Sequence, residues 1–239
     1  MSLVQKLPIG LGFACLMMMS SCSKEDALAP QQEMSKENSD ANARNGVIVK
    51  LPYAPPTIGS VGLDIYPEHW GRKVYPSSPS LSSLPTGTST LTHLWGDQAQ
   101  EWETPLPSIP FVNDVNSILT VTTKTNDFED NYKQAIVETK ISNLEPNNTY
   151  TLEYYVATTK PKGSLDGYAT GTSVGAFGPS AYNFNYQDLS LIPGLWKKAT
   201  LVFQATSTES VLIFKAISNG KKAYAHIYID KHSIKKKQY

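Results

Sequence analysis

The chain has 239 residues, its 21 basic side chains are balanced by 21 acidic ones, and 40% of its residues are hydrophobic. Nucleic-acid binding would need a basic face. The only basic block is the short run Lys235–Lys237, so the composition disfavours a nucleic-acid partner. A folded part of about 190 residues should bury roughly 70% of the surface of its unfolded chain, which is enough for a sizeable core.

The first 22 residues have the layout of a secretory signal. Lys6 precedes an apolar run from Leu7 to Met19, and two serines then lead to Cys22. A membrane-spanning helix needs about 20 apolar residues, whereas this run is shorter and contains a proline and two glycines. We therefore expect residues 1–21 to be a cleaved signal peptide and not a membrane span.

The segment around the cysteine resembles a known export signal. Met19-Ser20-Ser21-Cys22 resembles the lipobox of bacterial lipoproteins, which implies cleavage before Cys22 and a lipid anchor, diacylglycerol and palmitate, on that residue. Ser23–Asp26 is similar to the signal that directs lipoproteins of Bacteroidetes-type bacteria to the cell surface. The resemblance implies an outer-membrane protein that is held in the membrane by its lipid anchor and faces the cell exterior.

Cysteine usage and composition divide the rest of the chain. Removal of the signal also removes Cys15, so Cys22 is the one remaining thiol and no disulfide can form within the chain. Residues 22–46 are polar and contain no aromatic or β-branched residue after the cysteine, which is typical of a disordered tether. Stability must then come from burial in a folded domain over residues 47–239.

The domain shows the two-residue period of β-strands. A strand is expected at Val47–Val49, and loops with short strands are expected over residues 57–110, which are rich in Pro, Ser, Thr and Gly. From Ser117 onward six runs alternate apolar and polar residues. The residues expected to point inward are Leu119, Val121, Ala135, Val137, Ile141, Tyr150, Leu152, Tyr154, Val156, Ala199, Leu201, Phe203, Leu212, Phe214, Ala216, Ala225, Ile227 and Ile229.

Turn residues between these runs suggest how they are connected. Asn143–Asn148 is expected to join the second and third runs as a hairpin, and Ser218–Gly220 the fifth and sixth. No run has the length and apolar stripe of a helix. Several short half-polar strands at this spacing predict an all-β fold, an antiparallel β-sandwich or jelly roll.

Three segments resemble one family. Ile141–Val156, with the sequence ISNLEPNNTYTLEYYV, resembles a segment of galactose-binding-like jelly rolls, especially carbohydrate-binding modules. Gly194–Phe203 resembles the strand of that family that begins with a tryptophan, and Ala223–Asp230 resembles its closing strand. The resemblance covers about residues 117–235 and implies a jelly roll with a polysaccharide or oligosaccharide ligand.

Sugar-binding jelly rolls work through aromatic rings, because a pyranose presents a flat C–H face that packs on such a ring. Trp70, Trp95 and Trp102 lie among polar or turn residues, and Tyr168 lies between glycines, so these four are the expected ligand-binding residues. Trp196 matches a packing position of the family. The segment 160–193 reads as a long loop in which 181–189 forms a further strand, with Tyr182, Phe184 and Tyr186 expected to pack in the core.

Catalytic and metal-binding patterns are weak. Gly171–Gly175 fits G-x-S-x-G, but that motif needs a strand-turn-helix elbow, and no helical pattern follows it. His69, His93, His226 and His232 are scattered without zinc-like spacing. Asp127, Glu129 and Asp130 could bind a structural calcium ion, although an exposed acidic turn explains them better. We therefore expect no catalytic residues and no cofactor or metal.

Three functions remain open from the sequence. The leading one is a non-catalytic glycan-binding lipoprotein. The second is a subunit or adhesin of a surface assembly that recognises protein partners. A glycoside hydrolase is third, because the separation of a carboxylate pair is a spatial quantity that no sequence shows.

Overall fold

The computed structural model describes residues 50–73, 89–97, 99–130 and 132–238. The chain divides into two units, residues 1–41 and 42–239, and every described residue belongs to the second unit. The signal peptide, Cys22, the tether and the strand expected at 47–49 lie outside the described residues, so they stay predictions. Within the described ranges, no helix has the length and apolar character needed to cross a membrane.

The described residues form strands and no helix. The thirteen strands are β1 (Gly62–Leu63), β2 (Gly71–Arg72), β3 (Ser89–His93), β4 (Ser117–Thr123), β5 (Val137–Ile141), β6 (Thr149–Thr159), β7 (Gly167–Tyr168), β8 (Gly171–Phe177), β9 (Tyr182–Asp188), β10 (Lys197–Gln204), β11 (Ser210–Ile217), β12 (Ala223–Tyr228) and β13 (Ile234–Lys236). All six runs expected from residue 117 onward are strands, and so is the run expected at 181–189.

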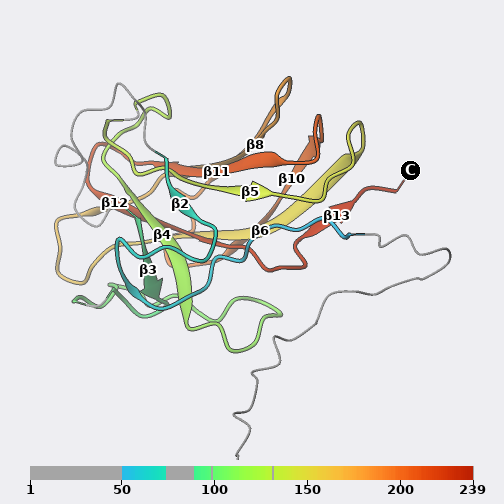
Figure 1. Ribbon diagram of the computed structural model, residues 1–239. Coiled ribbons are helices and arrows are strands. Elements are labelled where there is room, and N and C mark those ends of the chain that lie inside the picture. Colours follow the sequence, from blue (N-terminus) through green and yellow to red (C-terminus); the bar gives the residue numbers. More distant parts are fainter. Residues whose placement is uncertain (1–49, 74–88, 98, 131, 239) are drawn as a thin grey trace, which may run out of the picture. The chain divides into compact units, whose positions relative to one another are not determined.

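The strands build two sheets that pack face to face (Figure 1). The larger sheet has the order β1-β3-β4-β12-β6-β10, with β13 beside β6 and β7 beside β12. The smaller sheet has the order β2-β5-β11-β8-β9. Neighbouring strands are antiparallel except for β7 and β12.

The strand order is that of a jelly roll. The eight strands β4, β5, β6, β8, β9, β10, β11 and β12 divide into β4-β12-β6-β10 in the larger sheet and β5-β11-β8-β9 in the smaller one. Chain neighbours such as β4 and β5 therefore lie in opposite sheets, which is the interleaved pattern of two Greek keys. The predicted all-β sandwich is confirmed.

The core lies between the two sheets and is built from alternate residues of each strand. Every residue that the sequence placed inward on the six runs from Ser117 onward is a member of this cluster, from Leu119 on β4 to Ile229 after β12. Strand β6 shows the principle, because Tyr150, Leu152, Tyr154 and Val156 are buried while the side chains between them are only half-buried. A side-chain period of two thus selected the buried face correctly.

The two expected hairpins are wrong. Residues 143–148 lead from β5 to β6 and residues 218–220 lead from β11 to β12, and both connections cross from the smaller sheet to the larger one. The tight hairpin lies elsewhere: β8 and β9 are joined by residues 178–181, where the Gly178 N–H donates to the Ala181 carbonyl at 2.9 Å. The segment 160–193 is therefore not a long loop, since it contains β7, β8 and β9.

Part of the outer face of the larger sheet is covered by the connection between β3 and β4. This connection contributes buried side chains that pack on apolar residues of the sheet, and the cluster consists of Leu106, Ile109, Ile118, Ala157 and Tyr228. Trp196 is half-buried against the same cluster, and its indole N–H donates to the Pro107 carbonyl at 2.8 Å. The packing position expected for Trp196 is confirmed.

His226 lies under this cover, on the outward side of β12. Its Nδ1 is 2.8 Å from the Thr120 hydroxyl, its Nε2 is 2.6 Å from the Thr159 hydroxyl, and the Trp102 ring lies 5.5 Å away. A neutral imidazole offers one donor and one acceptor, so the two hydroxyls satisfy it. Burial lowers the pKa of His226 to about 3, because the charged form would lose its hydration.

We expect His226 to make the fold sensitive to acid. An unfolded histidine takes up a proton near pH 6.5, whereas His226 in the folded chain does so only near pH 3, so its contribution to stability is complete above about pH 6.5 and is lost as the pH falls toward 3. His226→Gln keeps hydrogen-bonding groups but cannot titrate. The free energy of unfolding, measured in urea at a series of pH values, should fall with acid more steeply in the natural protein, by up to about 1.4 kcal/mol per pH unit. Parallel pH profiles for the two proteins would contradict this role.

Candidate functional site

Two of the expected ligand-binding tryptophans are buried. Trp70 is 7% exposed and Trp102 is 1% exposed. Their indole N–H groups donate to the carbonyls of Pro55 at 3.1 Å and His93 at 3.2 Å. The expectation that these rings stand free on loops is therefore wrong, because each is packed against the sandwich with its one polar group satisfied.

The other two expected residues reach the surface. Trp95 is 49% exposed and stacks on His93, with 4.7 Å between the ring centroids and 12° between the planes. Tyr168 on β7 is half-buried, and the Lys160 ammonium lies 5.3 Å from the centre of its ring. These two residues stay candidates, but the largest group of exposed rings lies on the other sheet.

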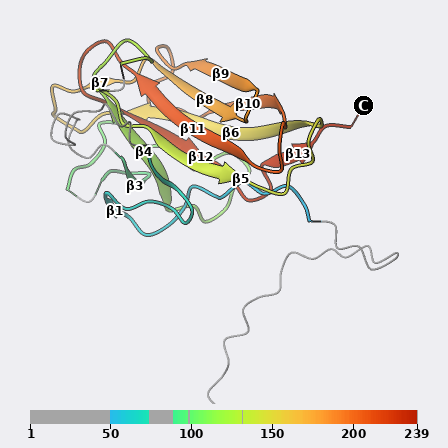
Figure 2. The same ribbon diagram turned by 45° about the horizontal axis from the view of Figure 1, so that its top comes forward.

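That group comes from β9, an edge strand of the smaller sheet. Tyr182, Phe184 and Tyr186 are 71%, 54% and 53% exposed, so their expected burial in the core is wrong. The alternate residues Asn183, Asn185 and Gln187 are half-buried. The Asn185 amide donates to the Thr200 carbonyl of β10 at 2.6 Å, which ties the polar side of β9 to the larger sheet and turns the aromatic side out. Figure 2 shows β9 beside β8 at the edge of its sheet.

Glycines of β8 make room for these rings. In the register of the two strands, Gly175 lies opposite Phe184, and Gly171 lies two residues from the position opposite Tyr186. A methyl group on Gly175 would come within 2.7 Å of the Phe184 ring, and one on Gly171 within 2.6 Å of the Tyr186 ring. The rings therefore lie over the bare backbone of β8, where larger residues would clash.

The same glycines explain the G-x-S-x-G pattern. Gly171–Gly175 is part of a regular strand, and Ser173 in its middle is 7% exposed and paired opposite Tyr186. A serine nucleophile needs a sharp turn that exposes its hydroxyl. The strand offers no such elbow, and its glycines are used for packing under aromatic rings.

Further rings join the group from neighbouring segments. Phe177 contacts Tyr182 and Phe184 edge to face, at centroid distances of 5.6 and 5.0 Å. Phe128 contacts Tyr186 in the same way at 5.7 Å. We call these five residues, Phe128, Phe177, Tyr182, Phe184 and Tyr186, the aromatic face. Edge-to-face contacts of this kind hold rings in fixed orientations.

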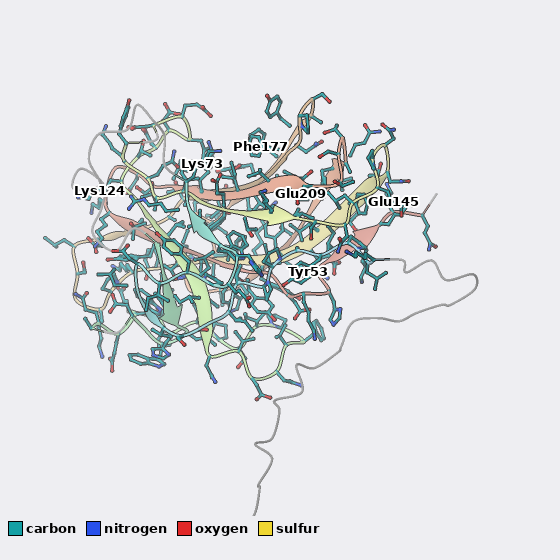
Figure 3. The ribbon with its side chains drawn as sticks, in the orientation of Figure 1. Tyr53, Lys73, Lys124, Glu145, Phe177 and Glu209 are labelled. Carbon is teal, nitrogen blue, oxygen red and sulfur yellow. The ribbon has the colours of Figure 1, made fainter. Side chains whose placement is uncertain are left out.

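Charged groups border the aromatic face. The Lys73 ammonium lies 5.7 Å from the centre of the Phe177 ring and 3.4 Å from a Glu138 carboxylate oxygen, and Figure 3 shows Lys73 and Phe177 on the same side of the domain. At the other end, the Lys215 ammonium lies 5.6 Å from the centre of the Phe128 ring and 3.6 Å from Glu129. The rings are thus framed by groups that can hydrogen-bond to a polar ligand.

Asp188 and Tyr186 add polar atoms at the end of β9. The hydroxyl and backbone N–H of Ser190 donate to the Asp188 carboxylate at 2.7 and 2.9 Å, and these bonds, with Lys197 nearby, lower the pKa of Asp188. Partial burial and the charge of Asp188 raise the pKa of Tyr186. At neutral pH the carboxylate therefore accepts hydrogen bonds and the phenol keeps its proton to donate one.

The acidic turn considered for calcium is engaged in local contacts. Asp127 accepts the Glu129 N–H at 2.8 Å, Asp130 pairs with Lys133 at 3.1 Å, and Glu129 lies near Lys215. Across the described residues, no group of three or more His, Cys, Asp or Glu side chains is arranged to hold a metal ion. The turn orders the loop that carries Phe128.

Comparison with known proteins gives similarity to solved structures. No family model matches the sequence, and no curated protein matches it. Among the 41 matching chains of solved structures are several carbohydrate-binding modules with a β-sandwich fold. The module TmCBM61 in complex with β-1,4-galactotriose matches with 6% identity and a TM-score of 0.42, over 71% of this chain and 90% of that one.

Two further structures are similar at the same level. A putative sugar-binding protein from Bacteroides thetaiotaomicron matches with 12% identity and a TM-score of 0.35, over 77% of this chain and 95% of that one. The enzymatically active domain of tailspike protein 4 from bacteriophage CBA120 matches with 9% identity and a TM-score of 0.43. The match covers 71% of this chain and 20% of the tailspike chain. All three TM-scores are below 0.5, so the function has to be inferred from the residues of this chain.

Proposed function

We propose that the protein is a lipoprotein of the outer membrane whose sandwich binds an extracellular glycan without catalysis. One observation carries the proposal: Tyr182, Phe184 and Tyr186 alternate along β9, each residue is more than half exposed, and glycines of β8 lie beneath two of the rings. Exposed apolar groups of this kind mark binding sites. A ligand that packs on these rings would remove their apolar surface from water, which favours binding.

The chemistry of the aromatic face suits a chain of sugars. A pyranose has flat C–H faces that pack on rings and hydroxyl groups around its rim that need polar partners. Alternate residues of a strand are about 6.8 Å apart, so successive rings of β9 can contact successive units of a polysaccharide that runs along the strand. Asp188 and the lysines at the border supply hydrogen bonds to the hydroxyls.

An aromatic patch can also bind a protein. Exposed Tyr and Phe side chains are enriched at protein interfaces, so a protein partner in a surface assembly is the second candidate. A protein interface of standard size buries about 800 Å² on each side. Substitutions on the aromatic face test both candidates, because the two classes of ligand can be offered to the same variants.

Loss of the central ring should weaken glycan binding. Truncation of an aromatic anchor costs about 2 kcal/mol or more, which is about thirtyfold in the dissociation constant. We expect Phe184→Ala to bind at least that much more weakly in affinity electrophoresis against plant, algal and host polysaccharides. Phe111→Ala is the matched control, because Phe111 is fully exposed and lies outside the aromatic face.

The outcomes of this experiment separate the alternatives. Phe184 is half exposed, so the thermal midpoints of both variants should stay close to that of the natural protein. If a polysaccharide retards Phe184→Ala but not Trp95→Ala, the binding site lies on the side of the larger sheet. If no polysaccharide retards the folded protein while a surface protein binds it and is released by Phe184→Ala, the second candidate is correct.

The anchor has a test of its own. The proposed lipidation of Cys22 predicts that Cys22→Ala abolishes metabolic labelling with palmitate and releases the protein from the outer membrane. Cys15→Ala is the control, since it removes a thiol from the segment that is expected to be cleaved. Unchanged labelling of Cys22→Ala would refute the anchor without touching the glycan-binding proposal.

A further inference from the structure

The smaller sheet carries a cavity at the edge opposite β9. It has a volume of about 620 Å³ and lies against β2 and β5, with Tyr53, Trp70, Gly71, Arg72, Lys140 and Ser142 among its lining residues. In the strand order β2-β5-β11-β8-β9, three strands separate β2 from the aromatic strand. The cavity is therefore distinct from the aromatic face but belongs to the same sheet.

The cavity exists because the edge of β5 is only partly paired. Gly71 and Arg72 pair with Glu138 and Val137, and the next pair on this edge joins Tyr53 to Ser142. Between these pairs no strand covers β5 among the described residues, and the alternation of the ladder turns the N–H and C=O of Lys140 toward the gap. A Cβ atom added to Gly71 would meet nothing within 4 Å, so the space above this residue is open.

Among the described residues around the cavity, the cations other than Arg72 form ion pairs with acidic side chains. His69 lies 3.4 Å from Glu68, Lys140 lies 3.3 Å from Glu209, and the one acid in the lining, Glu138, pairs with Lys73. Arg72 has no ion pair with any described residue, and its Nη2 is buried without a hydrogen-bond partner. Because Nη2 has almost no accessible surface, a ligand in the cavity would reach the guanidinium through its other nitrogens, and a planar carboxylate matches the geometry of a guanidinium best.

We propose that this cavity is a second subsite, which binds an acidic sugar through its carboxylate. The Arg72 guanidinium binds the carboxylate, and the sugar hydroxyls bond to the main chain of Lys140 and to the side chains of Ser142 and Tyr53. Trp70 and Pro55 supply the apolar wall. The inference rests on the proposed function in that the ligand is a glycan, and it adds that the glycan contains uronic acid residues.

The test compares two sugars that differ by one group. Galacturonate carries a carboxylate where galactose carries a hydroxymethyl group, and each is titrated into the purified protein by calorimetry. Galacturonate should bind at least about tenfold more tightly than galactose, because a hydrogen bond to a charged group strengthens binding by about that factor or more. Arg72→Met should abolish the difference. Lys162→Met, which removes a cation that is paired with Glu101 and lies outside the cavity lining, should keep it.

A second variant keeps the test possible if Arg72→Met does not fold. Gly71→Leu adds a side chain at a residue of the cavity lining, where a new Cβ meets nothing within 4 Å, and should hinder the binding of galacturonate. Equal binding of the two sugars, or a preference that survives both Arg72→Met and Gly71→Leu, would overturn the proposal, and tighter binding of galactose 6-sulfate would overturn the carboxylate assignment. Phe184→Ala leaves this subsite intact, so it should still bind galacturonate even if the aromatic face binds no glycan.

Discussion

The contact between the rings of β9 and the glycines of β8 determines the position of the exposed aromatic rings on the surface of this protein. Phe184 and Tyr186 lie over Gly175 and Gly171, where any Cβ would approach ring atoms to less than 3 Å. Rings placed in this way are supported from below and remain open on the other side. A strand with larger residues in place of these glycines would push the rings away, and the surface would lose its shape.

The two sheets differ in how their outer faces are covered. The core covers the inner face of the larger sheet, and the connection between β3 and β4 covers part of its outer face, where His226 is buried beside Trp102. The smaller sheet carries the exposed rings at one edge and the cavity beside Arg72 at the other. The core therefore stabilises both sheets, whereas the additional cover lies on the larger sheet, and the exposed rings and the cavity remain accessible on the smaller one.

The sequence predicts the fold better than the site, for a physical reason. A period of two identifies buried positions wherever one face of a strand is apolar, as in β6, and the jelly roll follows from many such strands. On β9 the rule fails, since the polar residues point inward to bonds such as that of Asn185 with Thr200. Likewise, Trp70 and Trp102 lie in polar stretches but are buried by contacts with distant residues, which local sequence does not reveal.

In the proposed function, the glycan lies along β9 on the smaller sheet. Amide chemical shifts of the protein, followed by NMR during titration with an oligosaccharide that it binds, test this most directly. We expect the largest changes at Phe177 and at residues 182–188, with small changes around Trp95 and Tyr168. Changes centred on Trp95 and Tyr168, with β9 unaffected, would contradict it.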